Sequence, residues 1–355
     1  MTSGKVRDPG LVKAALERWL PEALGVEAAE LVGLEKPSGS GFSNETFVFD
    51  VRYHSEGREQ TRGFALQAAP LGEGLFPEYD MLRMFHLQTL VGDHSQVPVA
   101  PMVACHIEPE LLGAPFYLME RVAGRVPTDN PSYHAEGWLH DASPEDQAAA
   151  WWSAIDALVK LRSIDPETTE LAFLEKGWQK PGVAAKLASW EHFMGEVVGE
   201  RSAPLLEEGL ARLKDRLPEE GPAGITWGDA KPGNIIYQGT RAAALLDWEL
   251  ASLGPPEEDL VHWIFIDRFL SEGLHVERLP HLPGREETLA RYQEQSGHEP
   301  RDVDWWELYS AWRLAVIIYR IMCIYKRLGL LPDEADPYEV NVAKGLLGTI
   351  LEGWR

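Results

Sequence analysis

The sequence is poor in cysteine and in basic residues, and it has no long hydrophobic run that is free of charge. Only Cys105 and Cys323 occur among 355 residues, which argues against a disulfide framework and a cysteine-based zinc site. The nearest approach to a membrane span, AWRLAVIIYRIMCIY, contains Arg313 and Arg320, so we interpret it as a buried helix. The first residues, MTSGKVRDPG, lack the apolar core of a signal peptide. These absences predict a cytoplasmic protein that does not bind membranes.

The shortage of basic residues also bears on binding partners. Lysine and arginine number 33 against 56 acidic residues, which gives a net charge of −23. Such a surface repels nucleic acid; it would suit a cationic substrate, although acidic surfaces mostly serve solubility. The histidines form no H-E-x-x-H pattern and no G-x-S-x-G sequence occurs, so neither a metallohydrolase nor a serine hydrolase is indicated.

The hydrophobic pattern changes along the chain from strand-like to helical. Strands are predicted in ETFVFDVRY, RGFALQAA, VPVAPMVACHI and APFYLMERV, with helices at residues 11–22 and 76–92. Beyond residue 145 helical patterns dominate, up to a long one at 302–328, and are interrupted by a predicted hairpin of NIIY and AAALLD. This order predicts an α+β chain of two lobes, residues 1–122 and 123–355, joined near RVAGRVPTDNP, where Gly and Pro cluster.

The segment ITWGDAKPGNIIYQGTRAAALLDWE contains two acids and an amide at a distinctive spacing. Asn234 follows Asp229 by five residues, and Asp247 follows Asp229 by eighteen, after the predicted hairpin. A kinase needs a carboxylate at the attacking hydroxyl and oxygen ligands for Mg²⁺. In this order and spacing we expect Asp229 to serve the hydroxyl, Asn234 and Asp247 to hold metal, and Lys231 to neutralise the transferring phosphoryl group. Taken singly, the same residues could simply cap a turn, sit in a loop and end a strand.

The sequences GDAKPGN and LLDWELASLGPPEEDL resemble the aminoglycoside phosphotransferase-like family, which includes choline- and aminoglycoside-kinase-like small-molecule phosphotransferases. The resemblance extends from about residue 30 to the C-terminus. It implies a protein-kinase-like fold, with a β-rich nucleotide-binding lobe and a helical catalytic and substrate lobe. It also implies ATP or another nucleoside triphosphate, Mg²⁺, and transfer to a hydroxyl of a small molecule such as an amino sugar or amino alcohol. The sequence specifies neither the acceptor nor an oligomeric state.

Two further segments resemble the nucleotide-binding parts of this family. In GSGFSN, Gly39 and Gly41 would let backbone N–H groups approach phosphate, and Ser43 and Asn44 could add donors. GAPFYLMERVAGRVP resembles the strand and hinge that hold adenine. There the nucleotide would be recognised by the hinge residues, namely Met119, Glu120 and Val122.

The chain departs from the family pattern at three places. Trp227 stands where a histidine usually precedes Gly-Asp, and we interpret it as a packing support. Gln67 occupies the place of the phosphate-gripping Lys or Arg, and the family pattern puts its acidic partner at Met84. A different register would bring Glu78 or Asp80 to that place instead. The missing charges favour an alternative, a nucleotide-binding protein with little or no kinase activity, whereas the intact acids favour the enzyme.

Aromatic and basic residues of the helical part have two interpretations. The tryptophans are expected in the core, although aromatic walls can also cage an amine; the set is Trp151, Trp152, Trp305, Trp306 and Trp312. Arg313 and Arg320 share one helix face. We expect them to pair with buried acids such as Asp259 rather than to bind substrate.

Overall fold

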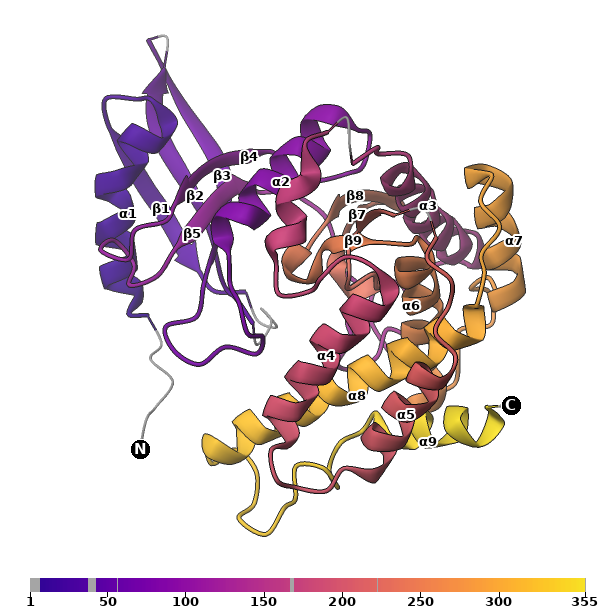
Figure 1. Cartoon of the computed structure of the whole chain (residues 1–355). Coiled ribbons are helices and arrows are strands. Elements are labelled where there is room, and N and C mark those ends of the chain that lie inside the picture. The colour runs from indigo at the N-terminus through magenta and orange to yellow at the C-terminus, as the bar shows by residue number, and fades with distance from the viewer. Residues whose placement is uncertain (1–6, 38–42, 56, 167–168, 222, 355) are drawn as a thin grey trace. The chain divides into compact units, whose positions relative to one another are not determined.

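The computed structural model describes residues 7–37, 43–55, 57–166, 169–221 and 223–354. Gly39 and Gly41 of the predicted phosphate loop lie outside these ranges. The chain divides into two compact units (Figure 1), one of Met1–Asp93 with Val99–Val122 and one of His94–Pro98 with Ala123–Arg355.

The first unit is built on an antiparallel sheet. Its five strands, within the described residues, lie in the order β1-β2-β3-β5-β4, with bounds β1 Ala29–Glu35, β2 Glu45–Ser55, β3 Arg58–Ala68, β4 Met102–His106 and β5 Phe116–Glu120. The described residues of this unit also form two helices, α1 Pro9–Leu24 and α2 Met81–His94. The predicted strands and the predicted helix at 11–22 are therefore confirmed. The helix predicted at 76–92 begins only at Met81, and β1 is an addition.

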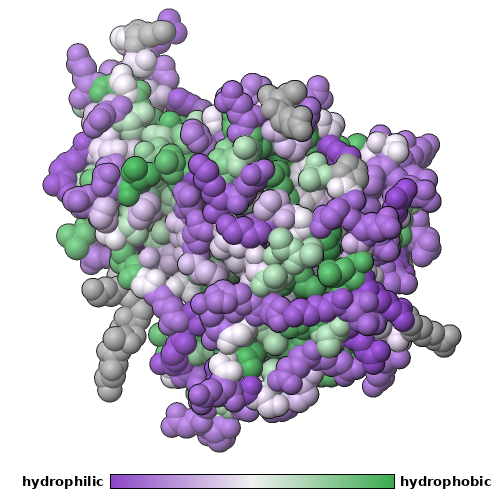
Figure 2. All heavy atoms as spheres, viewed as in Figure 1, coloured by the Kyte–Doolittle hydropathy of each residue, from purple (hydrophilic) through white to green (hydrophobic). Residues whose placement is uncertain are grey.

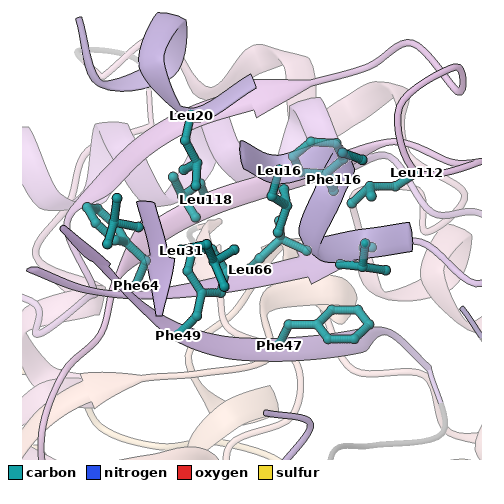
Figure 3. Close-up of a cluster of buried hydrophobic side chains, with 14 of the residues drawn as sticks. Leu16, Leu20, Leu31, Phe47, Phe49, Phe64, Leu66, Leu112, Phe116 and Leu118 are labelled. Carbon is teal, nitrogen blue, oxygen red and sulfur yellow. The ribbon is translucent and has the colours of Figure 1, made fainter. Parts of the chain in front are cut away.

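Alternation along β2 and β3 separates two hydrophobic clusters on the two faces of this sheet. Phe47, Phe49 and Val51 alternate along β2 and pack with Leu66 of β3 and Leu16 of α1 (Figure 3). The limits of helix α1 are set by its caps: Asp8 accepts a hydrogen bond from the N–H of Leu11, and Gly25 ends the helix in the left-handed conformation at φ 65°.

The second cluster joins the sheet to α2. It contains Ala65 of β3, Tyr117 and Met119 of β5, and Met81 and Met84 of α2. Because side chains alternate across a strand, Gln67 points to the same face of β3 as Ala65. Gln67 therefore lies on the side of the sheet that α2 covers.

The described residues of the second unit form mainly helices, with two small antiparallel pairs of strands. The helices are α3 Pro144–Arg162, α4 Val183–Val198, α5 Pro204–Asp215, α6 Glu257–Arg268, α7 Arg285–Ser296, α8 Val303–Arg327 and α9 Lys344–Gly353. The strands β6 Gly224–Thr226 and β9 Ser252–Gly254 pair, as do β7 Ile235–Gln238 and β8 Arg241–Leu245. Short 3₁₀ turns occur at Leu171–Lys176, Pro232–Asn234 and Trp248–Leu250, and a π-helical turn, Phe269–Gly273, follows α6. The predicted hairpin of NIIY and AAALLD is β7–β8, so this prediction is confirmed.

Helix α8 is the segment that the sequence presented as its most apolar. By length and composition it could cross a membrane, but 56% of its most apolar window is buried inside the protein. A core helix passes the same test, so this single helix is weak evidence for a membrane span. Hydrophilic side chains cover much of the face seen in Figure 2, in keeping with the net charge of −23.

Together the two units form the α+β architecture that the sequence predicts, with the antiparallel sheet first and the helices after it. Helices α6, α7 and α9 and the β6–β9 pair were not part of the prediction. The tryptophans Trp151, Trp305, Trp306 and Trp312 are each no more than 4% exposed, which confirms that they belong to the core. Trp152 is only partly buried, and Arg291 lies over its ring at 4.5 Å.

Candidate active site

The loop that follows β6 holds Asp229 by its backbone. The N–H groups of Trp227 and Gly228 donate to the two carboxylate oxygens of Asp259 at 2.6 and 2.7 Å. Gly228 has φ 91°, and a Cβ there would lie 2.3 Å from the carbonyl oxygen of Leu250. Only glycine fits this turn without displacing the backbone. The hydrogen bonds to Asp259 and the close contact with Leu250 therefore fix the residue before Asp229.

The side chain of Asp229 contacts three donors from its own loop and from α6. Its Oδ2 accepts from Asn234 Nδ2 at 2.8 Å and lies 3.4 Å from Lys231 Nζ. Its Oδ1 lies 3.3 Å from His262 Nε2. The Asn234 amide also donates to the Asp229 carbonyl oxygen at 3.1 Å. The structure therefore brings Asp229, Lys231 and Asn234 together, and it adds His262.

These contacts set the charge of Asp229 and of Lys231. Burial alone would raise the pKa of Asp229, but the charge of Lys231 and the hydrogen bond from His262 outweigh it, so the pKa falls well below its ordinary value. Burial acts to lower the pKa of Lys231, but Asp129 and Asp229 outweigh it and raise this pKa well above its ordinary value. Both groups are therefore charged at neutral pH.

Lys231 is shared between two acids. Its Nζ lies 3.0 Å from Asp129 Oδ2, a shorter separation than the 3.4 Å to Asp229. Asp129 also packs against the loop at Gly233, where a Cβ would lie 2.4 Å from Asp129 Oδ1. Asp129 therefore fixes the lysine in the loop, a contact that sequence spacing did not indicate.

Asp247 follows β8, with a strained backbone conformation and, in the described chain, an unpaired carboxylate. It has φ 59° and ψ 63°, a left-handed conformation that is uncommon outside glycine. Within the described residues its carboxylate has no hydrogen bond and no ion pair. Burial, and then the negative charge of Asp229, raises the pKa of Asp247 to about 6 against the opposing charge of Lys231. A cation at this carboxylate would relieve the repulsion.

Two oxygen ligands near Asp229 suit a Mg²⁺ ion. Asn234 uses its amide nitrogen on Asp229, which leaves its amide oxygen for a metal, and the Asp247 carboxylate is open. Mg²⁺ takes few protein oxygens and keeps water and phosphate as its other ligands. The described part of the chain contains no group of three or more His, Cys, Asp or Glu residues that could hold a metal.

A buried charge network supports the loop from the helices. Arg313 of α8 donates to the Gly228 carbonyl oxygen at 2.7 Å and to Glu258 of α6 at 3.3 Å. Glu258 also pairs with Lys186 of α4. The expectation that Arg313 pairs with a buried acid is confirmed, but the acid is Glu258. Asp259 was the wrong candidate because its carboxylate is used by the loop N–H groups.

In the first unit, Gln67 belongs to a neutral chain of hydrogen bonds. The hydroxyl of Tyr117 donates to Gln67 Oε1, and Gln88 Nε2 of α2 donates to the Tyr117 hydroxyl at 3.3 Å. Met84 instead packs in the apolar cluster and is 4% exposed. The residue of α2 that is connected to Gln67, through Tyr117, is thus Gln88, one helical turn after Met84. The correspondence of Met84 with the acid of the family pattern stays a prediction.

The two acids of the alternative register, Glu78 and Asp80, both contact Arg83 near the start of α2. Glu78 lies 3.5 Å from Arg83, and the carboxylate of Asp80 accepts from the N–H of Arg83 at the start of α2. These acids therefore serve the beginning of the helix.

The predicted nucleotide residues of the first unit have local partners. The Ser43 hydroxyl donates to Tyr79 at 2.8 Å, and Ser43 and Asn44 are both buried. In the hinge, the N–H groups of Glu120 and Arg121 donate to Pro101 and Gly63. The N–H of Val122 has no partner among the residues that the structure describes. Met119 is buried in the cluster under α2.

Trp227 has a more definite role than packing alone. It is fully buried, and its indole N–H donates to the Leu246 carbonyl oxygen at 2.7 Å. The indole therefore ties the loop of Asp229 to Leu246, the residue between β8 and Asp247. A cavity of about 750 Å³ elsewhere in this unit is lined by residues such as Arg216 and Trp354 and includes none of the described site residues, so concavity alone does not locate the site.

An α+β chain with this loop, a paired lysine and an open acid after a short hairpin defines a phosphotransferase of the small-molecule kinase class. The sequence model of the phosphotransferase enzyme family matches residues 36–307 of this chain. The chain belongs to this family, which confirms the resemblance seen in the sequence.

Curated relatives are longer than this chain. A probable acyl-CoA dehydrogenase of Arabidopsis thaliana is 27% identical over 81% of this chain and 35% of its own length. Acyl-CoA dehydrogenase family member 11 of Rattus norvegicus is 26% identical over 75% of this chain and 33% of its own length. This chain therefore spans about a third of these relatives.

Solved structures share the fold. A proposed aminoglycoside phosphotransferase from Ralstonia eutropha has a TM-score of 0.68 at 22% identity, with 96% of each chain covered. The macrolide 2'-phosphotransferase of Brachybacterium faecium has a TM-score of 0.57 at 19% identity over 93% of this chain and 97% of its own. An aminoglycoside phosphotransferase variant bound to ADP and hygromycin B has a TM-score of 0.56 at 15% identity, over 95% and 98% of the two chains.

Proposed function

We propose that this chain transfers the terminal phosphoryl group of ATP, or of another nucleoside triphosphate, to a hydroxyl of a small molecule, and that it requires Mg²⁺. The observation that carries the proposal is that the Asp229 carboxylate accepts a hydrogen bond from Asn234 and lies near Lys231, while the carboxylate of Asp247 is unpaired among the described residues. These groups are the ones that in-line phosphoryl transfer requires.

Asp229 and Lys231 act on the reacting groups. The acceptor hydroxyl donates to Asp229, its oxygen forms a bond to the terminal phosphorus, and the bond from that phosphorus to the bridging oxygen of the nucleoside diphosphate breaks. Because the pKa of Asp229 is low, the carboxylate is a weak base, so it mainly orients the hydroxyl and receives the proton as the new bond forms. Lys231 neutralises charge on the phosphoryl oxygens.

The metal and nucleotide roles fall to other residues. Asn234 and Asp247 would hold Mg²⁺, which neutralises the phosphate oxygens when it is bound. The nucleotide would contact residues of the first unit: Gly39, Gly41, Ser43, Asn44, Gln67, Met119, Glu120 and Val122. Among the hinge residues, Val122 is the one with an N–H left to donate.

The acceptor we propose is a hydroxylated small molecule with a positive charge, such as an amino sugar or amino alcohol, in the cytoplasm. The net charge of −23 supports a cationic acceptor, as does the hygromycin B bound to one protein of the same fold. The names of the curated relatives add a second acceptor to test, a hydroxyacyl thioester of coenzyme A.

Nucleotide binding and turnover test this proposal together. ATP should raise the melting temperature more with Mg²⁺ than without it, with GTP as the comparison nucleotide. Phosphoryl transfer is then measured against hydroxylated amines, amino sugars, hydroxyacyl thioesters and water. Asp229→Asn should lower turnover by roughly 10²–10⁴, whereas Asp304→Asn, an exposed acid of α8, should not. Mg²⁺-dependent binding without turnover on any acceptor would favour the alternative, a nucleotide-binding protein with little or no kinase activity.

A further inference from the structure

His262 is a buried imidazole that contacts the proposed catalytic carboxylate. It lies on α6, its side chain is 3% exposed, and its Nε2 is 3.3 Å from Asp229 Oδ1. Its other nitrogen, Nδ1, is buried and has no hydrogen-bond partner in the described part of the chain. The ring is thus held in place by packing and by a single polar contact, to Asp229.

The contact determines which nitrogen carries the proton. An ionised carboxylate only accepts hydrogen bonds, so Nε2 must be the donor and Nδ1 the bare nitrogen of a neutral ring. The surroundings agree, because burial and the positive charge of Arg313 lower the pKa of His262 to about 4. With a proton already on Nε2, the ring cannot accept the proton of an acceptor hydroxyl on that side.

The two oxygens of Asp229 are used unequally. Oδ2 meets both Asn234 Nδ2 at 2.8 Å and Lys231 Nζ at 3.4 Å. Oδ1 meets only His262 among the described residues. Because each carboxylate oxygen can accept about two hydrogen bonds, Oδ1 is the oxygen that keeps a place for a hydroxyl.

We propose that His262 is a positioning residue for Asp229, and that its Nε2–H holds Oδ1 so that the second acceptor site of this oxygen receives the acceptor hydroxyl. This inference rests on the function proposed above. The hydroxyl proton passes to Oδ1 as the oxygen–phosphorus bond forms, and then to water, while His262 keeps its own proton throughout. This role requires an N–H donor at the position of His262 Nε2, so side chains of different length at position 262 can test it.

Three substitutions separate the donor from the ring. In His262→Gln the amide nitrogen can lie about where Nε2 lies, in His262→Asn the donor is too short, and in His262→Leu there is none. Loss of a hydrogen bond to a charged group should lower kcat about ten- to a hundredfold. We expect this loss in the Leu and Asn variants with an unchanged KM for ATP, and recovery of most of kcat in the Gln variant.

A second buried histidine provides the matched control. His134 is 3% exposed and its Nε2 contacts Asp267. His134→Leu removes a comparable ring from the same unit and should leave kcat unchanged below its melting temperature. Equal losses of kcat in the Gln, Asn and Leu variants of His262, or a loss of the same size in His134→Leu, would overturn the positioning role.

Imidazole ¹⁵N chemical shifts test the contact without turnover. In the unmodified protein His262 should show a protonated Nε2 and a bare Nδ1, and Asp229→Ala should shift the Nε2 signal while the His134 signals stay in place. An unmoved His262 signal would refute the inference whatever the activity. A protein that transfers phosphoryl to no acceptor, water included, but shows the expected shifts would instead refute the proposed function and confirm the contact.

Discussion

The neutral chain from Gln67 through Tyr117 to Gln88 should accept a charged pair only if both ends change. Gln67→Lys alone removes the acceptor of the buried Tyr117 hydroxyl, which should cost about 1–3 kcal/mol of unfolding free energy. Gln88→Glu alone buries an unpaired carboxylate at a site that is 3% exposed and should cost as much or more. In the double variant the two charges compensate, and we expect a coupling of about 1–3 kcal/mol.

The same pair should change nucleotide affinity. A cation at position 67 that is held by an acid would replace a neutral contact to phosphate with a charged one, a gain of about 1.5–3 kcal/mol or ten- to a hundredfold in affinity. Gln67→Lys alone should gain less, because its cation is not held. Urea unfolding and calorimetric titration with AMP-PNP and Mg²⁺, on all four proteins, measure both effects.

Met84→Glu is the control for this cycle. Met84 lies in an apolar cluster, so an acid there should destabilise the protein without coupling to Gln67→Lys. Additive effects in the Gln67–Gln88 cycle, or a stronger coupling to Met84, would refute the assignment of Gln88.

Three other predictions concern the second unit. Asp247→Ala should abolish the Mg²⁺-dependent part of the ATP-induced rise in melting temperature; equal ATP binding with and without Mg²⁺ in the unmodified protein would disprove the metal assignment. Asp259→Asn removes one of two acceptors from the loop N–H groups and should lower the free energy of unfolding by about 1.5–3 kcal/mol in urea titrations; an unchanged value would show that the cap is dispensable. His262 has a pKa lowered from 6.5 to about 4, so the unfolded chain binds its proton first and stability falls as pH drops from about 6.5 to 4; His262→Gln should reduce that fall by up to about 3 kcal/mol, and identical pH slopes would contradict the burial of a neutral ring.

The sequence predicted the parts of this protein whose patterns are local. Alternation located β2 and β3, and the five-residue spacing identified Asp229 and Asn234 as neighbours in space, because a tight loop holds both. The change from a strand-like to a helical hydrophobic pattern also predicted the order of the two units. Each of these features depends on residues that are close in the chain, so it can be predicted from the local sequence.

The residues that reasoning from sequence missed come from distant elements. His262 and Asp129 lie 33 and 100 residues from Asp229, and a lone histidine or aspartate carries no signal of its own. The link from Gln67 to Gln88 was missed for a different reason: a shift by one helical turn keeps the same face of α2, so periodicity cannot distinguish position 84 from 88. Contacts between elements decided both cases.

The network of Lys186, Glu258 and Arg313 draws on α4, α6 and α8, which are far apart in the chain. The Gly228 carbonyl receives its buried donor from α8, the second-last helix of the described residues. The loop that carries Asp229 can therefore reach its final geometry only after the chain has been made to Arg313 and α8 has docked. In a polypeptide that ends before residue 303, Glu258 should lack the cation of Arg313, and the Gly228 carbonyl should lack its donor. Recovery of phosphoryl transfer during refolding therefore reports the docking of α8 rather than the formation of the loop itself.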